Sequence, residues 1–539
     1  MASESLGETS LAPPNLGMWL VLAVAWFATM GWRPLLEPDE GRYAEIPREM
    51  AVSGDWVTPR LDGLKYFEKP PLQYWATAAA YSVVGVTEGA ARLWSCALAF
   101  LCIPLVYAFS RHLYGSRGVA AAAAAVLAIN PLFAIVGQLD TLDSAFCFFL
   151  TAAVFAFLRA RAEVMASAAE RAWMVAAAVL MAGAVLSKGI AALVLAGGTL
   201  ALHMAITREV RPIARWHLPV TIPAFLLVCV PWFVAVSIRN PEFPEFFFIH
   251  EHFARYLTDV SERVQPWWFF LALMLLAILP WLSRVIPAAR SLGTPTARSQ
   301  ESSVRWFLVA WCGFVIFFFS LSRSKLVPYI LPVMPALAVL LAPAIAERLR
   351  SVRWAAWTNA AIVVLFAVAL IVAGRREESV QVAEVWPGAA VAVAVAIVGA
   401  LISKKSWVVP ALASLLAFQA LVVSYGAFPA ARSAKALVAA VRSHVHPQTR
   451  LFSVNQYRQS IPPYLGRTLE LVIYRGELDF GLRHGNRRFL ATLEAFIPEW
   501  TRQTDALAFT DMETVNAMNA QGVPLRVVGG DGETIVIAR

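Results

Sequence analysis

The sequence predicts an α-helical polytopic membrane protein that carries a small α/β domain at its C-terminal end. Of its 539 residues, 59% are hydrophobic and 15% are charged, whereas about a quarter of the residues of a soluble domain are charged. Apolar runs of about 18 residues or more, the length of a membrane-spanning helix, recur up to residue 425. Beyond residue 425 the chain becomes polar, and short strand-like and helix-like patterns alternate, as in a small α/β unit.

The apolar runs predict about thirteen spans. They are expected at residues 16–32, 90–109, 119–136, 143–158, 172–186, 190–206, 218–238, 267–282, 304–321, 326–345, 354–373, 387–402 and 407–425. A further run, 71–86, is shorter than the roughly 20 residues that a span needs. It is expected to lie along the membrane interface, where Tyr74, Trp75 and Tyr81 suit the depth of the lipid headgroups.

The basic residues set the expected orientation. If 71–86 is not a span, one class of alternate loops contains the basic clusters at 111–117, 159–171, 208–215, 284–305, 348–353 and 404–405. By the positive-inside rule that side is cytoplasmic. The N-terminus is then cytoplasmic, and the first loop (33–89) and the tail face the periplasm of a bacterium.

Charge and cysteine content exclude several classes of protein. The net charge of +9 is attributed to orientation and to anionic lipids, and no basic–aromatic pattern indicates binding of nucleic acid. The first ten residues lack a basic n-region, so the first apolar run is expected to be retained. All five cysteines lie in apolar runs, so neither a disulfide framework nor a thiolate metal cluster is expected.

The sequence divides into a membrane domain, residues 1–425, and a periplasmic α/β domain, residues 426–539. In the tail, helices are expected at 433–445, 487–501 and 512–520, and strands at 451–454, 469–473, 506–510, 525–528 and 534–537. The tail contains no glycine-rich phosphate loop and no nucleophile elbow. It is therefore interpreted as a lid or docking module, with the chemistry elsewhere.

The candidate site begins in the polar segment 37–75, which is unusual in so apolar a chain. Asp39 and Glu40 supply a carboxylate at the membrane surface that is suited to act as a base or an orienting group. The alternative is that Asp39 caps a helix that starts near Gly41. The Arg42 side chain is suited to bind a phosphate, and the Tyr43 side chain is suited to bind a sugar. The alternative here is a solvated helix face, which is favoured for a neighbouring set of charged residues: Glu45, Arg48 and Glu49.

Further candidates follow along the chain. Tyr66, Glu68 and Lys69 belong to the sequence KYFEKPP, in which the two prolines stiffen the backbone after Lys69 and suit it to a lipid phosphate. Snorkelling of Lys69 at a helix start is the alternative. Asp140 and Asp143 are three residues apart, so one helix face is able to hold both, facing Asp39. The alternative for Asp143 is capping.

Three basic residues, Lys188, Arg323 and Lys325, lie in outer turns, against the orientation bias. They are interpreted as lining a phosphate-binding cavity, with headgroup contact as the alternative. Tyr329 is expected to face the same region, although an interfacial tyrosine is an equal interpretation.

The loop after the span at 218–238 suggests a metal site. His250 and His252, with a carboxylate such as Glu68, suit a divalent metal, but the ligand set is incomplete and the pattern is common by chance. Arg255, in the same loop, suits an anionic substrate.

At these residues the chain resembles a known family. The similar segments are PDEGRYAEIPREM (38–50), GDWVTPRLDGLKYFEKPPLQYW (54–75), LSKGI (186–190), IHEHFARYL (249–257) and SKLVPYILPVMPAL (324–337). They resemble the aminoarabinose transferases of Gram-negative bacteria, lipid-to-lipid glycosyltransferases of the GT-C class that are related to the protein O-mannosyltransferases. The resemblance covers residues 15–425, with a tail of suitable size. Asp62 stands where Asn is expected in relatives.

The resemblance implies a GT-C fold and a reaction. It implies transfer of 4-amino-4-deoxy-L-arabinose from undecaprenyl phosphate to phosphate groups of lipid A, in the bacterial inner membrane, with resistance to polymyxin and other cationic peptides as the result. A monomer is expected. The alternatives are another polyprenyl-linked sugar, a hydroxyl acceptor, or a flippase of lipid-linked sugar, which would place charges within helix centres.

The resemblance also implies roles for residues. Asp39 is then the catalytic carboxylate, and the expected metal is zinc, bound by Glu68 and either His250 or His252. The donor pocket would be lined by Arg42, Tyr43, Tyr66, Lys69 and Tyr329.

Overall fold

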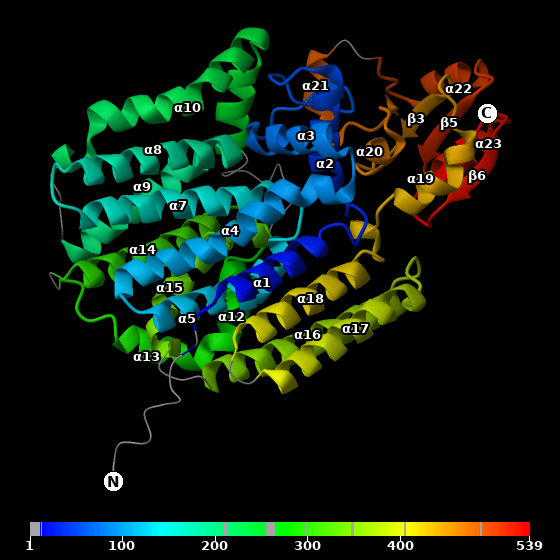
Figure 1. The fold of residues 1–539 in the computed structure, drawn as a ribbon. Helices are drawn as coiled ribbons and strands as arrows, with labels where there is room; N and C mark the ends of the chain where they lie inside the picture. The colour runs from blue at the N-terminus through cyan, green and yellow to red at the C-terminus, as the bar shows by residue number, and fades with distance from the viewer. Residues whose placement is uncertain are drawn as a thin grey trace.

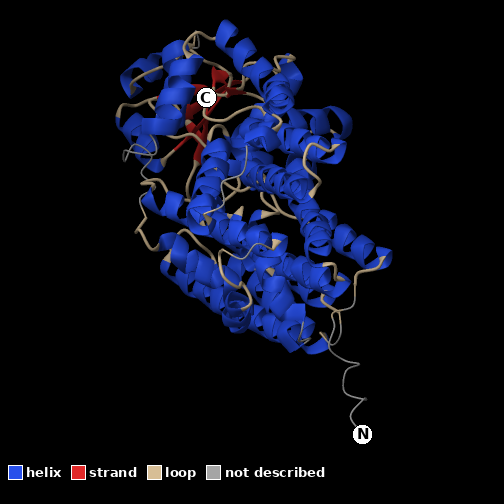
Figure 2. Cartoon of the chain, turned by 90° about the vertical axis from the view of Figure 1, so that its left-hand side faces the viewer, coloured by secondary structure: helices blue, strands red, loops and turns tan. Residues whose placement is uncertain are grey.

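The protein is a long helical bundle with a small mixed domain at one end (Figure 1). A computed structural model describes residues 11, 13–208, 213–254, 265–296, 299–346, 350–403, 406–485 and 488–539. Figure 2 shows the strands gathered near the C-terminus, and the rest of the molecule mostly helical. The predicted class, a polytopic helical membrane domain followed by an α/β domain, is confirmed.

Within the described ranges, nine helical segments are long and apolar enough to cross a membrane. They are α4 (Glu88–Tyr114), α7 (Leu142–Ala162), α8 (Ala168–Lys188), α10 (Leu218–Arg239), α12 to α13 (Phe269–Arg290), α14 (Gln300–Leu321), α16 (Arg350–Arg376), α17 (Val382–Ile402) and α18 (Val408–Tyr425). Four shorter apolar helices are α1 (Leu16–Ala28), α5 (Arg117–Ile129), α9 (Ala191–Thr207) and α15 (Val333–Ala346). These helices occupy the predicted positions, but the count of about thirteen spans stays a prediction.

Two predicted spans are interrupted. The run 119–136 forms α5 and a separate helix, α6 (Pro131–Val136), because the Asn130 side chain accepts a hydrogen bond from the Phe133 amide and restarts the helix. The run 267–282 forms α12 (Phe269–Ile278), a 3₁₀ turn at Leu279–Trp281 and α13 (Leu282–Arg290). Pro280 lies in that turn and has no amide hydrogen to continue the helix.

The first loop folds over one end of the bundle. It contains α2 (Asp39–Ser53), the strands β1 (Arg60–Leu61) and β2 (Leu64–Lys65), and α3 (Leu72–Val84). Asp62 and Gly63 join the two strands with φ values of 56° and 75°, the left-handed pair of a tight hairpin turn, which Asp and Gly both tolerate. At 13 residues α3 is too short to span.

The C-terminal domain is a mixed five-stranded sheet in the order β4-β3-β5-β7-β6. Its strands are β3 (Arg450–Val454), β4 (Glu470–Val472), β5 (Ala506–Thr510), β6 (Arg526–Gly530) and β7 (Ile535–Ala538). Its helices are α19 (Lys435–Val441), α20 (Ile461–Leu465), α21 (Asp479–His484), α22 (Leu493–Thr501) and α23 (Met512–Ala520). β3 pairs in parallel with β4 and β5, whereas β7 is antiparallel to β5 and β6. The predicted strands and helices agree with these, except that α22 starts later than 487.

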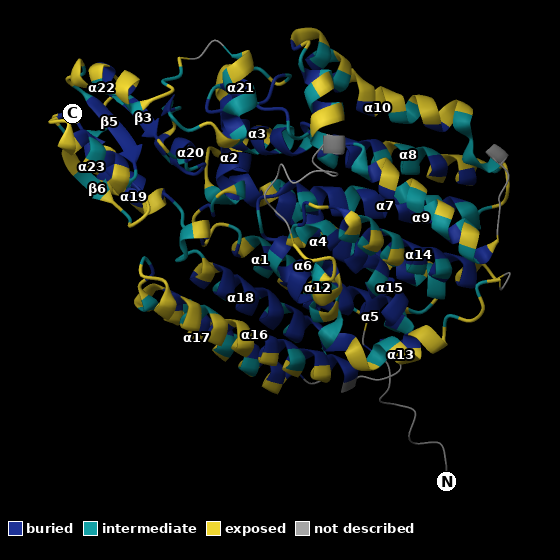
Figure 3. Cartoon of the chain, turned by 180° about the vertical axis from the view of Figure 1, so that it is seen from behind, coloured by how far each residue is buried: buried dark blue, intermediate teal, exposed yellow. Residues whose placement is uncertain are grey.

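The first loop and the C-terminal domain share one hydrophobic core. Ile46 and Met50 of α2 are buried in the same cluster as Leu437 of α19 and Leu469 before β4. Figure 3 shows buried residues where α2 and α20 lie near one another. A Cβ atom on Gly41 would lie 2.5 Å from the backbone at Gln459 and Ser460, so only glycine allows this approach. The tail is therefore docked on the loop that carries Asp39 and five other candidate residues.

Candidate functional site

The site is built around the first turn of α2. Asp39 opens the helix, and its carboxylate accepts a hydrogen bond of 2.7 Å from Arg42 Nη1. The Asp39 side chain is 42% exposed, whereas that of Arg42 is 7% exposed. No side chain caps the start of α2, so the capping interpretation of Asp39 was wrong. Asp39 presents a solvent-accessible carboxylate that is held by a buried guanidinium.

A carboxylate of the C-terminal domain, that of Glu477, also binds Arg42. Glu477 Oε2 forms an ion pair with Arg42 Nε at 2.7 Å, and it accepts a hydrogen bond of 3.1 Å from the Tyr66 hydroxyl. Gln459 donates to the other carboxylate oxygen. Burial raises the pKa of Tyr66 well above its ordinary value, so Tyr66 stays protonated and donates. The interpretation of the tail as a module without site residues missed Glu477, because no sequence pattern links it to Arg42.

Tyr43 is buried beside Tyr74 of α3. Its ring stacks on Tyr74 with centroids 6.0 Å apart. Burial raises the pKa of Tyr43, and Tyr74, Asp39 and Asp143 raise it further. Tyr43 therefore stays protonated.

Asp143, in the first turn of α7, pairs with Lys188, the last residue of α8. The Lys188 amine also lies 4.4 Å from the ring centroid of Tyr329, close enough for a cation–π contact. Lys188 and Tyr329 thus lie together as predicted, and the pairing of Lys188 with Asp143 was not predicted. Capping by Asp143 was wrong, because Thr141 precedes α7 and makes no side-chain cap bond. The first loop and the ends of three bundle helices meet at one end of the molecule.

A third group lies beside Lys69. Lys69 Nζ donates to the Glu68 carbonyl at 2.8 Å and lies 3.4 Å from Glu251 Oε2. Glu251 belongs to the π-helical segment Glu245–Ala254 and lies 3.5 Å from His250 Nδ1. His250 stacks on Phe246, and its side chain is 48% exposed.

The predicted metal site stays a prediction. In the part of the chain that the structure describes, no three His, Cys, Asp and Glu side chains are close enough to hold a metal ion. The side chain of His252 and all of Arg255 lie outside the described residues.

Two further basic candidates lie in the turn after α14. Arg323 is exposed in the turn after α14. Lys325 is buried, and its amine donates to the Ser322 carbonyl of the same turn. Both lie in the turn that leads to Tyr329.

Two acidic residues with expected roles at the site are buried behind it. Glu40 is bound by Arg33 and Arg92, two arginines that the sequence analysis did not single out. Asp140 is fully buried and lies before α7, so it does not share a helix face with Asp143, contrary to expectation. Asp140 lies outside the helix, because α7 begins only at Leu142.

The other charges of α2 are not a solvated face. Glu45 and Glu49 are buried, and Arg48 forms two hydrogen bonds with Glu45. Glu49 accepts from the Gly63 amide of the hairpin. The solvated interpretation was wrong because the tail and the hairpin cover this side of α2.

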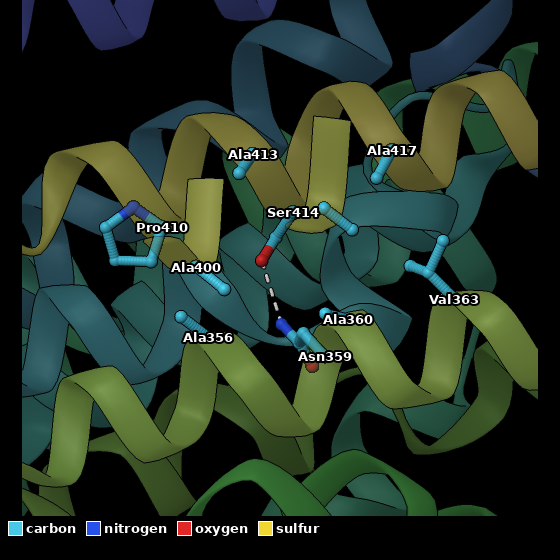
Figure 4. Close-up of a pocket in the computed structure, with 10 residues that line it drawn as sticks. Ala356, Asn359, Ala360, Val363, Ala400, Pro410, Ala413, Ser414 and Ala417 are labelled. Carbon is cyan, nitrogen blue, oxygen red and sulfur yellow. Dashed lines mark hydrogen bonds between the residues drawn. The ribbon is translucent and has the colours of Figure 1, made fainter. Parts of the chain in front are cut away.

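A small pocket lies elsewhere, among α16, α17 and α18 (Figure 4). Its walls are mostly alanine, and Asn359 donates a 2.8 Å hydrogen bond to Ser414 across it. It contains none of the candidate residues.

The arrangement combines an accessible carboxylate, fixed cations and protonated phenols. Cations suit the phosphate of a lipid, and a carboxylate next to them suits positive charge that develops on a sugar carbon. The site is therefore suited to group transfer between lipid-borne anions.

Comparison with known proteins identifies the family. The structure superposes on a crystal structure of ArnT from Cupriavidus metallidurans bound to undecaprenyl phosphate, with a TM-score of 0.86 and 31% sequence identity over 97% of each chain. The apo form of that protein gives a TM-score of 0.85 at 30% identity, again over 97% of each chain. The chain belongs to the aminoarabinose transferase family.

Two family models agree with this placement. Residues 20–247 match the dolichyl-phosphate-mannose-protein mannosyltransferase model, and residues 437–539 match the aminoarabinose transferase C-terminal domain. The resemblance found in the sequence, including the GT-C class, is thereby confirmed.

Curated relatives carry the family's full name, undecaprenyl phosphate-alpha-4-amino-4-deoxy-L-arabinose arabinosyl transferase. One from Aeromonas hydrophila is 32% identical over 288 residues, 53% of this chain and 52% of that protein. One from Pseudomonas aeruginosa is 32% identical over 275 residues, half of each chain. The chain thus spans about half the length of the curated relatives it matches.

Proposed function

We propose that this protein transfers 4-amino-4-deoxy-L-arabinose from undecaprenyl phosphate to phosphate groups of lipid A. The observation that carries the proposal is the likeness, over 97% of the chain, to ArnT bound to undecaprenyl phosphate. The charged groups around Asp39, Lys188 and Lys69 support it, because fixed cations beside a carboxylate suit the transfer of a sugar between phosphates. The reaction would occur at the periplasmic face of the bacterial inner membrane, by a monomer, and would confer resistance to polymyxin and other cationic peptides.

The reaction exchanges one sugar–phosphate bond for another. An oxygen of the lipid A phosphate attacks the anomeric carbon, and the bond from that carbon to the undecaprenyl phosphate oxygen breaks. The departing undecaprenyl phosphate keeps the bonding electrons. Because a phosphate acceptor is already an anionic nucleophile, a strong general base is less necessary than for a hydroxyl acceptor.

Asp39 is then assigned an electrostatic role. Its carboxylate orients the acceptor or stabilises the positive charge that develops at the anomeric carbon. Arg42 fixes that carboxylate through a 2.7 Å hydrogen bond, and Glu477 holds Arg42 from its other side. Arg42 and Glu477 therefore hold the Asp39 carboxylate in position before the substrate binds.

Cations would stabilise the leaving phosphate. Lys69 is held between the Glu68 carbonyl and Glu251 at the loop surface, and Lys188 is held by Asp143 and Tyr329. Exchange of their carboxylate partners for the lipid phosphate would bring charge-assisted hydrogen bonds to the leaving group. Arg255, Arg323 and Lys325 remain candidates for the same anionic lipids.

A divalent metal, zinc by the family resemblance, remains part of the proposal. Glu68 and His250 or His252 would hold it, and it would supply positive charge near the donor phosphate when bound. Metal analysis of the purified protein by mass spectrometry, with Glu68→Gln as the comparison, tests this. About one equivalent of zinc in the wild type that is lost in Glu68→Gln supports the metal site. Less than a tenth of an equivalent in the wild type contradicts it.

Mass spectrometry of lipid A from cells with and without the gene tests the reaction. Aminopentose adducts that depend on the gene support the proposal. A hexose adduct indicates another sugar donor, and an unchanged lipid A indicates another acceptor or a transport function. Product formed by purified protein in detergent excludes pure transport.

A further inference from the structure

Behind the exposed site residues lies a buried polar cluster that is centred on Glu40. The Glu40 carboxylate is bound by both guanidinium groups of its neighbours, with contacts of 2.8 Å to Arg92 Nε and 3.0 Å to Arg33 Nη2 among them. It also accepts from the backbone amides of Leu36 and Asp140, each at 2.9 Å. Arg92 additionally binds the carbonyls at Met30, Arg33 and Pro34. Glu40 therefore ties the start of α2 to α4 and to the connection before α7.

Asp140 extends the cluster to α3. Its Oδ1 atom accepts a 2.8 Å hydrogen bond from Gln73 Nε2, and the same amide lies 3.0 Å from Ser95 Oγ. Ser95 in turn donates to the Thr141 carbonyl at 3.0 Å. Gln73, Ser95 and Asp140 are all buried, so water does not compete for these bonds.

Each member of the cluster lies close in the chain to a residue of the site. Glu40 follows Asp39 directly. Gln73 comes four residues after Lys69, and Asp140 comes three residues before Asp143. The three anchors bind one another in series, from Glu40 to the Asp140 amide and from the Asp140 side chain to Gln73. Three chain segments that carry site residues are thus fixed to one another below the surface.

We propose that Glu40, Asp140 and Gln73 form a positioning cluster that sets the spacing between Asp39, Asp143 and Lys69. These residues touch no substrate and act through the segments they anchor. The inference rests on the proposed transfer reaction, for which a displacement of about 1 Å between charged groups can cost on the order of a hundredfold in rate.

Burial within the cluster favours the neutral form of Asp140. Burial raises the pKa of Asp140 well above its ordinary value, and the negative charge of Glu40 raises it further. The titratable and charged groups that face Asp140 come from four segments: Arg33 before α2, Glu40 in α2, Tyr74 and Tyr81 in α3, and Arg92 and Cys96 in α4. A protonated Asp140 has the shape and hydrogen-bonding capacity of asparagine.

That similarity gives a sharp test. Asp140→Asn keeps an acceptor for Gln73 and loses no charge, whereas Asp140→Leu and Gln73→Leu each break the bond. Each variant is purified as the full chain, and its kcat, its KM for donor and its Tm are measured. We expect Asp140→Asn to stay within about threefold of wild type, and the leucine variants to lose about tenfold or more in kcat with little change in KM. The loss of kcat in the double leucine variant should exceed that of the more damaging single variant by no more than about twofold, since both substitutions break the same hydrogen bond.

Several outcomes overturn the inference. If Asp140→Asn is as damaging as Asp140→Leu, Asp140 acts as a charged ligand. If the leucine variants lose Tm but keep kcat, the cluster is only structural. A wild-type protein that transfers no sugar refutes the proposed function. In that case hydrogen–deuterium exchange tests whether the cluster fixes the segments that carry Asp39 and Asp143. Faster exchange at both 37–43 and 141–147 in Gln73→Leu supports the cluster, and unchanged exchange at either segment contradicts it.

Discussion

Arg42 of the first loop and Glu477 of the C-terminal domain form an ion pair at 2.7 Å, in which both side chains are largely buried. Tyr66 donates to the same carboxylate. The candidate site is therefore completed by a residue from the far end of the chain. A domain that contains no recognisable catalytic pattern contributes directly to how Arg42 holds Asp39.

We predict that Glu477→Gln lowers the transfer rate by about tenfold or more. The amide keeps an acceptor for Tyr66 but loses the charge that fixes Arg42, and a hydrogen bond to a charged group contributes roughly 1.5–3 kcal/mol. Steady-state transfer assays check this, with Glu533→Gln, an exposed glutamate of the same domain, as the control. Equal rates for the two variants would argue against a role for Glu477.

Asp39→Asn should lower kcat by about 10²–10³-fold while Tm stays close to that of wild type, because the carboxylate is partly exposed and its loss removes electrostatic stabilisation. Asp55→Asn is the matched control, since Asp55 lies in the same loop and pairs with Arg239 away from the site. Near-normal turnover of the Asp39 variant would remove it from the site.

The docking of the tail on α2 gives a prediction about stability. A methyl group at Gly41 would meet the backbone at Gln459 and Ser460 at 2.5 Å, and overpacking of this kind costs about 1–3 kcal/mol. Gly41→Ala should lower Tm by several degrees and reduce transfer. Gly313→Ala, in a helix position with open space around it, should do neither. An unchanged Tm for Gly41→Ala would show that the two parts do not dock this way.

Asp140 gives a prediction about pH. Its folded pKa is raised above the ordinary 3.8, so its contribution to stability is fully present below pH 3.8 and is lost as pH rises toward the folded pKa. Asp140→Asn does not titrate. The Tm of this variant relative to wild type should therefore increase from about pH 4 to pH 7. Differential scanning fluorimetry across that range measures the difference, and a constant difference would mean that Asp140 is ionised.

Composition and apolar runs were sufficient to predict the helical bundle and the docked α/β domain. They were sufficient because a lipid environment leaves little choice but helices, and because strand and helix patterns in the tail are strongly periodic. The breaks at Asn130 and Pro280 were missed, since residues that end a soluble helix also occur within membrane spans.

The site was predictable where the chemistry is local. Asp39 and Arg42 are one helical turn apart, and the outer turns placed Lys188 in the same region as Tyr329 once the orientation was known. The contact of Arg42 with Glu477 depends on tertiary docking, which no local pattern encodes. Charge alone also failed to separate Asp39 from Glu40, because burial, and not residue type, decides that one is exposed and the other is enclosed by two arginines.

The most direct test is transfer by the purified full chain in detergent, with labelled undecaprenyl-phosphate aminoarabinose as donor and lipid A as acceptor. Labelled aminoarabinose on lipid A phosphate, absent with Asp39→Asn, is the predicted result. Intact donor and unmodified lipid A after incubation with a folded, donor-binding enzyme would contradict the account.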